Sequence, residues 1–162
     1  MHSRRTIGED FFGEECANLD REAVQLCKIQ LDHQVLELGF GPGIGIEAAC
    51  QLVKGLGHRN GVIAVGPQVK GKVYGVDFSD EMVIAATKRV KKDIDDGKVE
   101  LINGDVTDLS CFASNTFDRV FHCNCYYFWP DMDTITSELH RVEKLNSRTN
   151  KALEGPRPFS IW

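Results

Sequence analysis

The sequence lacks long hydrophobic runs. No stretch reaches the roughly 20 apolar residues that a membrane-spanning helix needs. The first sixteen residues, MHSRRTIGEDFFGEEC, contain no apolar segment of the length found in secretory signal peptides. We therefore expect a cytoplasmic chain without a membrane span.

The sequence also lacks an excess of basic residues. It has 19 Lys and Arg against 24 Asp and Glu, for a formal charge of -5. The densest basic cluster is KRVKK at 88–92, and its spacing is typical of a solvated helix face. An acidic chain without a basic stripe is a poor candidate for binding nucleic acid.

Metal-binding cysteine patterns are missing as well. Six cysteines stand at positions 16, 27, 50, 111, 123 and 125, but none forms a C-x-x-C pair. A zinc site is therefore not expected, and we assign no metal ligands. Reduced thiols are the default for a protein of this compartment.

What the sequence does contain is an alternation of strand and helix patterns in a chain of single-domain length. Strands are predicted at 34–39, 72–77, 98–105 and 117–123, and helices at 20–29, 45–55, 79–94 and 132–142. Asp20 is the predicted N-cap of the first helix. Such alternation predicts a parallel sheet, whose ligands bind beyond the carboxyl ends of the strands.

A glycine-rich stretch, VLELGFGPGIGIEAA, joins the first strand to the next helix, with glycines at 39, 41, 43 and 45. It is not a P-loop, because no Lys-Ser or Lys-Thr follows it. A dinucleotide-binding loop would need a small third residue at position 44 or 46, where the chain has Ile44 and Ile46. An NAD-binding domain is therefore only a distant alternative.

Three segments together resemble a known family. VLELGFGPG, VYGVDFSDEM and LINGDVTDL occur in the order, and on the elements, typical of class I Rossmann-like methyltransferases that use S-adenosylmethionine (SAM). The similarity runs from Val35 to Val142 and is strongest to the ubiquinone/menaquinone-biosynthesis (type 11) branch. It implies a three-layer αβα sandwich, SAM as cofactor, a small-molecule methyl acceptor and a SAM-binding domain over residues 1–142.

The resemblance also implies roles for individual residues. Glu37 would place the methionine end of SAM, Asp77 would accept hydrogen bonds from the ribose hydroxyls, and Asp105 would accept one from the adenine amino group. Phe78 and Met82 would flank the adenine ring. The full predicted cofactor set is Glu37, Gly39, Gly41, Gly43, Asp77, Phe78, Met82, Asp105, Val106 and Cys123. Asp77 and Asp105 could instead be ordinary caps or turn formers. No catalytic residue is assigned.

One departure from the family pattern lies between the helix that follows the glycine loop and the predicted strand at 72–77. VKG occurs at 53–55 and again at 69–71, and the segment between the two copies fits neither neighbouring element. The acidic residue that binds ribose normally follows the glycine loop by about 20 residues, whereas here the interval is longer. We predict that 56–68 is an exposed insertion loop; a natural surface hairpin is the alternative.

A second departure follows Val142. Residues 143–162 show no strand alternation and are predicted to be a disordered tail with prolines at 156 and 158. The sheet would then be partial, in the order 3-2-1-4, with the fourth strand at an unpaired edge open to self-association. Two functions stay open: an active methyltransferase, or a truncated isoform that binds SAM weakly or not at all.

Overall fold

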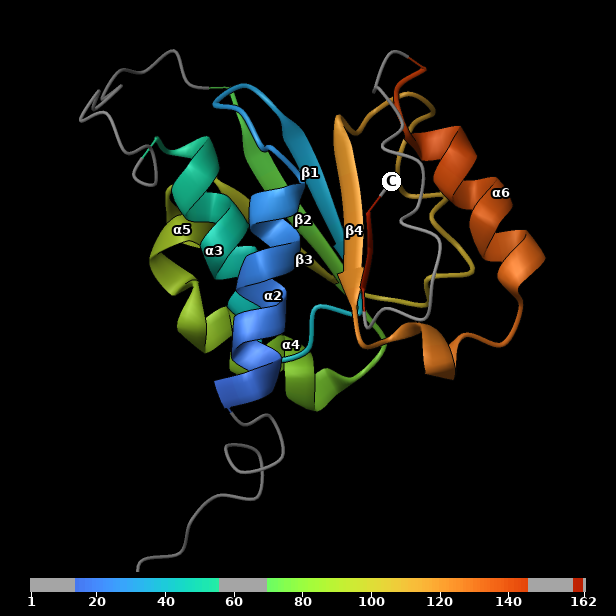
Figure 1. Ribbon diagram of the computed structural model, residues 1–162, viewed down its shortest axis with the longest axis horizontal. Coiled ribbons are helices and arrows are strands. Elements are labelled where there is room, and N and C mark those ends of the chain that lie inside the picture. Colours follow the sequence, from blue (N-terminus) through green and yellow to red (C-terminus); the bar gives the residue numbers. More distant parts are fainter. Residues whose placement is uncertain (1–13, 56–69, 146–158, 162) are drawn as a thin grey trace, which may run out of the picture.

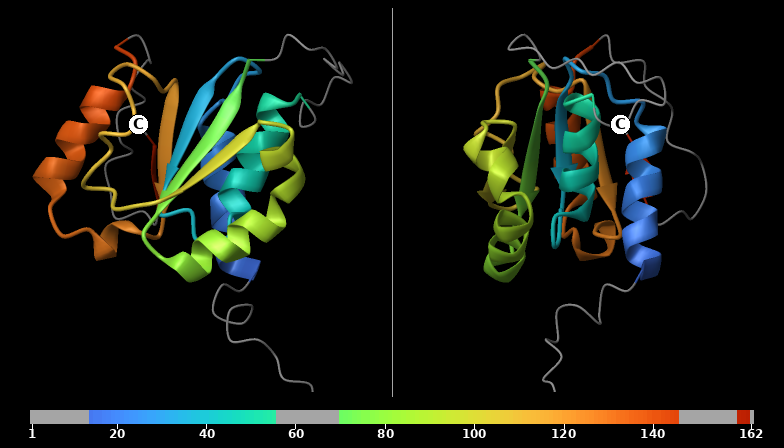
Figure 2. Two further views of the ribbon diagram at one scale, coloured as in Figure 1. Left: turned by 180° about the vertical axis from the view of Figure 1, so that it is seen from behind. Right: turned by 90° about the vertical axis from the view of Figure 1, so that its left-hand side faces the viewer.

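The computed structural model describes residues 14–55, 70–145 and 159–161. The described residues form three layers (Figure 1). Helices α2 (Glu14–Leu26), α3 (Ile44–Val53), α4 (Asp80–Arg89) and α5 (Lys91–Asp95) cover one face of the central sheet, and α6 (Met132–Val142) covers the other. Figure 2 shows the same division from behind and from the side. This is the predicted αβα sandwich.

The sheet contains β1 (Gln34–Leu38), β2 (Lys72–Asp77), β3 (Val99–Asn103), β4 (Arg119–Cys123) and β5 (Phe159–Ile161), in the order β3-β2-β1-β4-β5. The first four strands are parallel, which confirms the predicted order 3-2-1-4. In register, Glu37 of β1 stands between Gly75 of β2 and Phe121 of β4. The carboxyl ends of β1, β2 and β4 therefore meet at one edge of the sheet.

The fourth strand is not an unpaired edge, and that prediction is wrong. β5 pairs with β4 in the antiparallel direction, with His122 opposite Ser160 and Cys123 opposite Phe159. The prolines at 156 and 158 precede β5, and the three residues of β5 all carry an N–H group, so proline does not prevent this pairing. The predicted reason for self-association is therefore removed.

We expect that Ser160→Pro will weaken this pairing, because proline lacks the N–H group and disfavours antiparallel pairing. The variant should melt at a lower temperature than the parent chain and elute as larger species in size-exclusion chromatography, since an open strand edge recruits other strands. Ser160→Thr keeps the N–H group and serves as the control. Identical elution and melting of the proline variant and the parent would show that β5 does not shield the edge of β4 from other strands.

Two helix boundaries differ from the predictions. The first helix begins at Glu14, so Asp20 lies inside α2 and is not its N-cap. The helix predicted at 79–94 is divided at Val90, whose φ of -107° and ψ of 23° are not helical. Val90 is buried in the core, so its side chain packs against the core at the break. Ser79 is the N-cap of α4, and its side chain accepts the N–H of Met82.

Two apolar clusters hold the layers together. The first lies between the sheet and helices α2 to α5 and includes Val24, Ile46 and Phe121. The second lies between the sheet and α6 and includes Leu36, Phe117 and Leu139. Side chains of a strand alternate between faces, so Phe121 and Val120 of β4 belong to different clusters. A parallel sheet covered on both faces in this way needs the nearly continuous apolar strands that the sequence provides.

The predicted insertion at 56–68 lies outside the described residues. Within the residues described, none of the helices combines the length and apolar character needed to cross a membrane.

Candidate functional site

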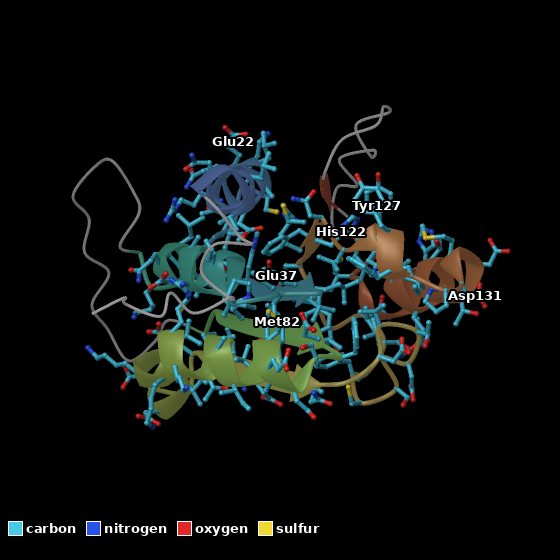
Figure 3. All side chains as sticks on the ribbon, turned by 90° about the horizontal axis from the view of Figure 1, so that it is seen from below. Glu22, Glu37, Met82, His122, Tyr127 and Asp131 are labelled. Atoms are coloured by element: carbon cyan, nitrogen blue, oxygen red, sulfur yellow. The ribbon has the colours of Figure 1, made fainter. Side chains whose placement is uncertain are left out.

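A cavity of about 480 Å³ opens at the carboxyl ends of the strands. This volume is within the range of roughly 300–1,000 Å³ that is typical of small-molecule sites. Figure 3 looks onto this edge of the sheet, with Glu37 and Met82 near its centre and Tyr127 on the side of α6. Parallel sheets bind their ligands at this end, as the sequence predicted.

Eight of the ten predicted cofactor residues line this cavity. They are Gly39, Gly41, Asp77, Phe78, Met82, Asp105, Val106 and Cys123. Glu37 and Gly43 are not among the lining residues. Gly43 is the N-cap of α3. A Cβ at this position would lie 2.8 Å from the Cβ of Ala86, so Gly43 allows the start of α3 to pack closely against α4.

Asp77 fixes the glycine loop from the end of β2. One carboxylate oxygen accepts the backbone N–H of Gly41 at 2.9 Å, and the other accepts that of Ser79 at 2.9 Å. The side chain is buried, with 5 % of its surface exposed. Asp77 thus forms local turn contacts, as the alternative interpretation held, and it also lines the cavity. Each oxygen keeps further acceptor capacity toward a ligand.

Asp105 follows β3 and is exposed at the cavity. Its Oδ1 accepts the N–H and the hydroxyl of Thr107, both at 2.8 Å. The turn-forming interpretation therefore describes part of its role as well. Its position beside Val106 and across from the end of β2 brings it into the same cavity as Asp77, because β2 and β3 are neighbouring strands.

Glu37 lies beneath the cavity and is almost fully buried, with 1 % of its surface exposed. The N–H of Ile46 donates to its carboxyl group, but Oε2 has no hydrogen-bond partner among the described residues. Burial, and then the charges of Asp20 and Asp77, raises the pKa of this carboxyl well above its usual range. A cation placed here would relieve that cost.

Gly45 explains why the carboxyl group of Glu37 fits under the loop. A Cβ at position 45 would lie 2.3 Å from Glu37 Oε1 and 2.6 Å from Oε2. Only a residue without a side chain allows α3 to begin directly over this carboxyl group. The fourth glycine of the sequence motif therefore accommodates a buried acid.

The cysteines at the end of β4 and just after it are protonated at neutral pH. Burial raises the pKa of Cys125 to about 12 and also raises that of Cys123. The Cys125 thiol donates to the carbonyl of Leu38 at 3.2 Å. Both residues line the cavity, but as thiols and not as nucleophilic thiolates.

His122 faces the other side of β4 and is not among the lining residues. Its ring packs against Trp129, with ring centroids 4.6 Å apart, and Trp129 does line the cavity. Burial lowers the pKa of His122 to about 4, and its Nδ1 has no partner among the described residues. This histidine therefore supports the cavity wall in its neutral form.

The buried His122 predicts a pH effect on stability. Between its ordinary pKa of 6.5 and the folded value of about 4, the unfolded chain binds a proton that the folded chain does not. Stability should therefore fall by roughly 3 kcal/mol as the pH drops through this range. The His122→Phe variant should not show this fall. The measurement is the free energy of unfolding in urea at pH 7.5 and at pH 4.5.

The exposed His140 of α6 provides the control, because His140→Gln should keep the parent difference between the two pH values. The raised pKa of Glu37 contributes with the opposite sign, but it is present in all three proteins and cancels in the comparison. An unchanged pH dependence in His122→Phe would contradict the prediction.

Sequence reasoning missed part of the cavity wall. Phe40, Pro42, Asn124 and Cys125 are strand-end neighbours of the predicted cofactor residues, whereas the residues that were missed are Asp20, Ser79, Phe128, Trp129 and Pro130. The aromatic run at 126–129 was a usable signal, because it directly follows a strand end in the sequence. Asp20 gave no such signal, since it stands on a helix that precedes the first strand.

Comparison with known proteins agrees with this geometry. A family model described as a methyltransferase domain matches residues 36–148. The chain belongs to the class I SAM-dependent methyltransferases. It is of the ubiquinone/menaquinone type, and SAM is the cofactor of that family.

Two curated relatives are demethylmenaquinone methyltransferases. The protein from Geobacillus kaustophilus (strain HTA426) is 40 % identical over 87 residues, which are 53 % of this chain and 35 % of the relative. The protein from Geobacillus sp. (strain WCH70) is 38 % identical over 98 residues, covering 60 % and 40 % respectively. The chain thus matches well under half the length of these relatives.

Solved structures share the fold. A SAM-dependent methyltransferase from Aquifex aeolicus aligns with a TM-score of 0.64 and 22 % identity, over 85 % of this chain and 65 % of its own. A phosphoethanolamine N-methyltransferase from Haemonchus contortus, solved with S-adenosylhomocysteine, aligns with a TM-score of 0.59 and 25 % identity, over 78 % and 26 %.

Proposed function

We propose that this chain binds SAM in the cavity and transfers its methyl group to a small-molecule acceptor. The observation that carries the proposal is the hydrogen bond from the N–H of Gly41 to Asp77. In a dinucleotide-binding loop the backbone N–H groups face a pyrophosphate. Here a carboxylate takes that N–H group, so the loop suits a ligand with hydroxyl donors, such as a ribose.

The charge of the cavity supports the same conclusion. Its lining includes Asp20, Asp77 and Asp105, and the described lining residues include no Lys, Arg or His. Such a surface repels a pyrophosphate and attracts a cation. SAM carries a sulfonium and an ammonium group against one carboxylate, and it therefore matches the sign of this cavity.

The buried carboxyl of Glu37 fits SAM as well. Its unpartnered Oε2 lies next to the glycine loop, where the methionine end of the cofactor would be placed. In this assignment Asp77 holds the ribose, and Asp105 with Phe78 and Met82 holds the adenine. The half-buried Met82 and the exposed ring of Phe78 provide apolar surface for a flat base.

When bound, SAM supplies an electrophilic methyl group to an acceptor aligned in line with its C–S bond. The chain's part is alignment and exclusion of water. Phe128, Trp129 and Pro130 form an apolar side of the cavity, and this side is our proposed acceptor site. An acceptor with a flat apolar ring would suit it, and demethylmenaquinone is the first compound to test because the curated relatives carry that name.

Isothermal titration with SAM and with NAD tests the binding proposal. We expect SAM to bind and NAD to give no heat of binding. Binding of NAD alone would overturn the proposal. Methyl transfer to demethylmenaquinone is then measured with radiolabelled SAM. Tight SAM binding without transfer to this or related acceptors would favour the non-catalytic alternative.

A further inference from the structure

Helix α2 brings an acidic side chain to the cavity. Ala23 and Val24 of α2 are fully buried in the first apolar cluster, which fixes the helix against the sheet. Asp20 precedes them by three and four residues and so lies on the same side of the helix. Its side chain lines the cavity together with Gly39 and Cys123.

The carboxyl group of Asp20 is held in place by β4. The Cys123 thiol and Asp20 share a side-chain hydrogen bond, and burial raises the pKa of Asp20. The neighbouring Arg21 acts on Asp20 by its charge, but the guanidinium of Arg21 binds Asn18 Oδ1 at 3.3 Å on the exposed side of the helix. Asp20 therefore presents a fixed, partly desolvated negative group to the cavity.

A second observation indicates what ligand group belongs there. The charge of Asp20 acts on the carboxyl group of Glu37, whose buried Oε2 lacks a partner among the described residues. One carboxyl group, that of Asp20, therefore lines the cavity, and a second, that of Glu37, lies buried beneath it with an unused acceptor oxygen. An ammonium group carries a positive charge and three donors, which is the complement of this arrangement.

We propose that Asp20 binds the α-ammonium group of the methionine part of SAM. This inference rests on the proposed function, because it requires SAM in the cavity. It assigns a binding role to a helix that precedes the glycine loop in the chain. It also gives the cavity an order: Asp20 and Glu37 at the methionine end, Asp77 at the ribose, and Asp105 at the adenine.

The test is a double-mutant cycle between protein and ligand, measured by isothermal titration. The ligands are SAM and an analogue in which hydrogen replaces the α-amino group. We expect Asp20→Asn to weaken SAM binding about tenfold or more, because a charge-assisted hydrogen bond is lost. The same substitution should leave the affinity for the analogue unchanged.

Glu22→Gln is the matched control. Glu22 is exposed on α2 and lies on the side away from Glu37 (Figure 3), so its substitution should change neither affinity. Equal weakening of SAM and the analogue by Asp20→Asn would assign Asp20 a structural role and overturn the inference. So would unchanged SAM binding in this variant.

A measurement on the parent chain covers the case in which Asp20→Asn does not fold. The analogue should then bind at least tenfold more weakly than SAM, and equal affinities would contradict the inference. If the parent chain binds neither ligand, the proposed function itself fails, and that outcome is distinct from failure at Asp20 alone.

Discussion

Replacing Asp77 with alanine should weaken SAM binding about thirtyfold, which corresponds to about 2 kcal/mol. The ribose hydroxyls would lose a charged acceptor in our assignment. The backbone N–H groups of Gly41 and Ser79 would lose their acceptors too, so the glycine loop and the start of α4 would no longer be held together. The affinity is measured by isothermal titration and the stability by thermal melting.

Two further variants separate these effects. Asp77→Asn keeps an acceptor oxygen and should fall between the parent and the alanine variant. Asp108→Ala removes an exposed aspartate that similarly accepts the N–H of Ser110 but does not line the cavity. It should leave SAM affinity unchanged. Full SAM affinity in Asp77→Ala would remove Asp77 from the cofactor site.

Replacing Gly39 with alanine should have the largest effect on folding and binding together. Gly39 has a φ of +62°, and a Cβ there would lie 2.5 Å from the Cβ of Cys125 and 2.8 Å from its Sγ. The left-handed backbone and the overlap together should cost about 2–4 kcal/mol of stability. The displaced loop should also weaken SAM binding by more than tenfold.

Gly41→Ala is the matched control. Its φ of +52° imposes a similar backbone cost of roughly 1–2 kcal/mol, but a Cβ there meets nothing within 4 Å. Comparing the two variants therefore isolates the contact with Cys125. Cys125→Gly removes both overlapping atoms and should restore much of the stability lost in Gly39→Ala. Equal melting temperatures for the two alanine variants would contradict this account.

The residues at the strand ends could be placed from the sequence alone. Asp77 and Asp105 could be placed in one cavity from the sequence, because each directly follows a strand and parallel strands end at the same edge. The helix at 132–142 could be placed as well, since Ile135, Leu139 and Val142 recur with helical spacing and are buried. Local periodicity was sufficient for such features.

The structure decided what depends on contacts between distant segments. Asp20 reaches the cavity only because α2 packs beside β4, and no local pattern on α2 encodes that neighbour. β5 is three residues long, which is too short for any alternation to show, and the partner strand β4 specifies it. Likewise, the sequence does not distinguish Gly45 from the other glycines of the loop, and only the structure places it against the carboxyl group of Glu37.

The sequence by itself thus determined the first four strands, their parallel order and the acids at their ends. These follow from residue spacing and from the family resemblance. Only the tertiary structure decided that Asp20 joins the cavity, that β5 covers β4, and that Gly45 makes room for the carboxyl of Glu37. The physical reason is that close packing and the satisfaction of buried polar groups depend on which distant residues become neighbours in space.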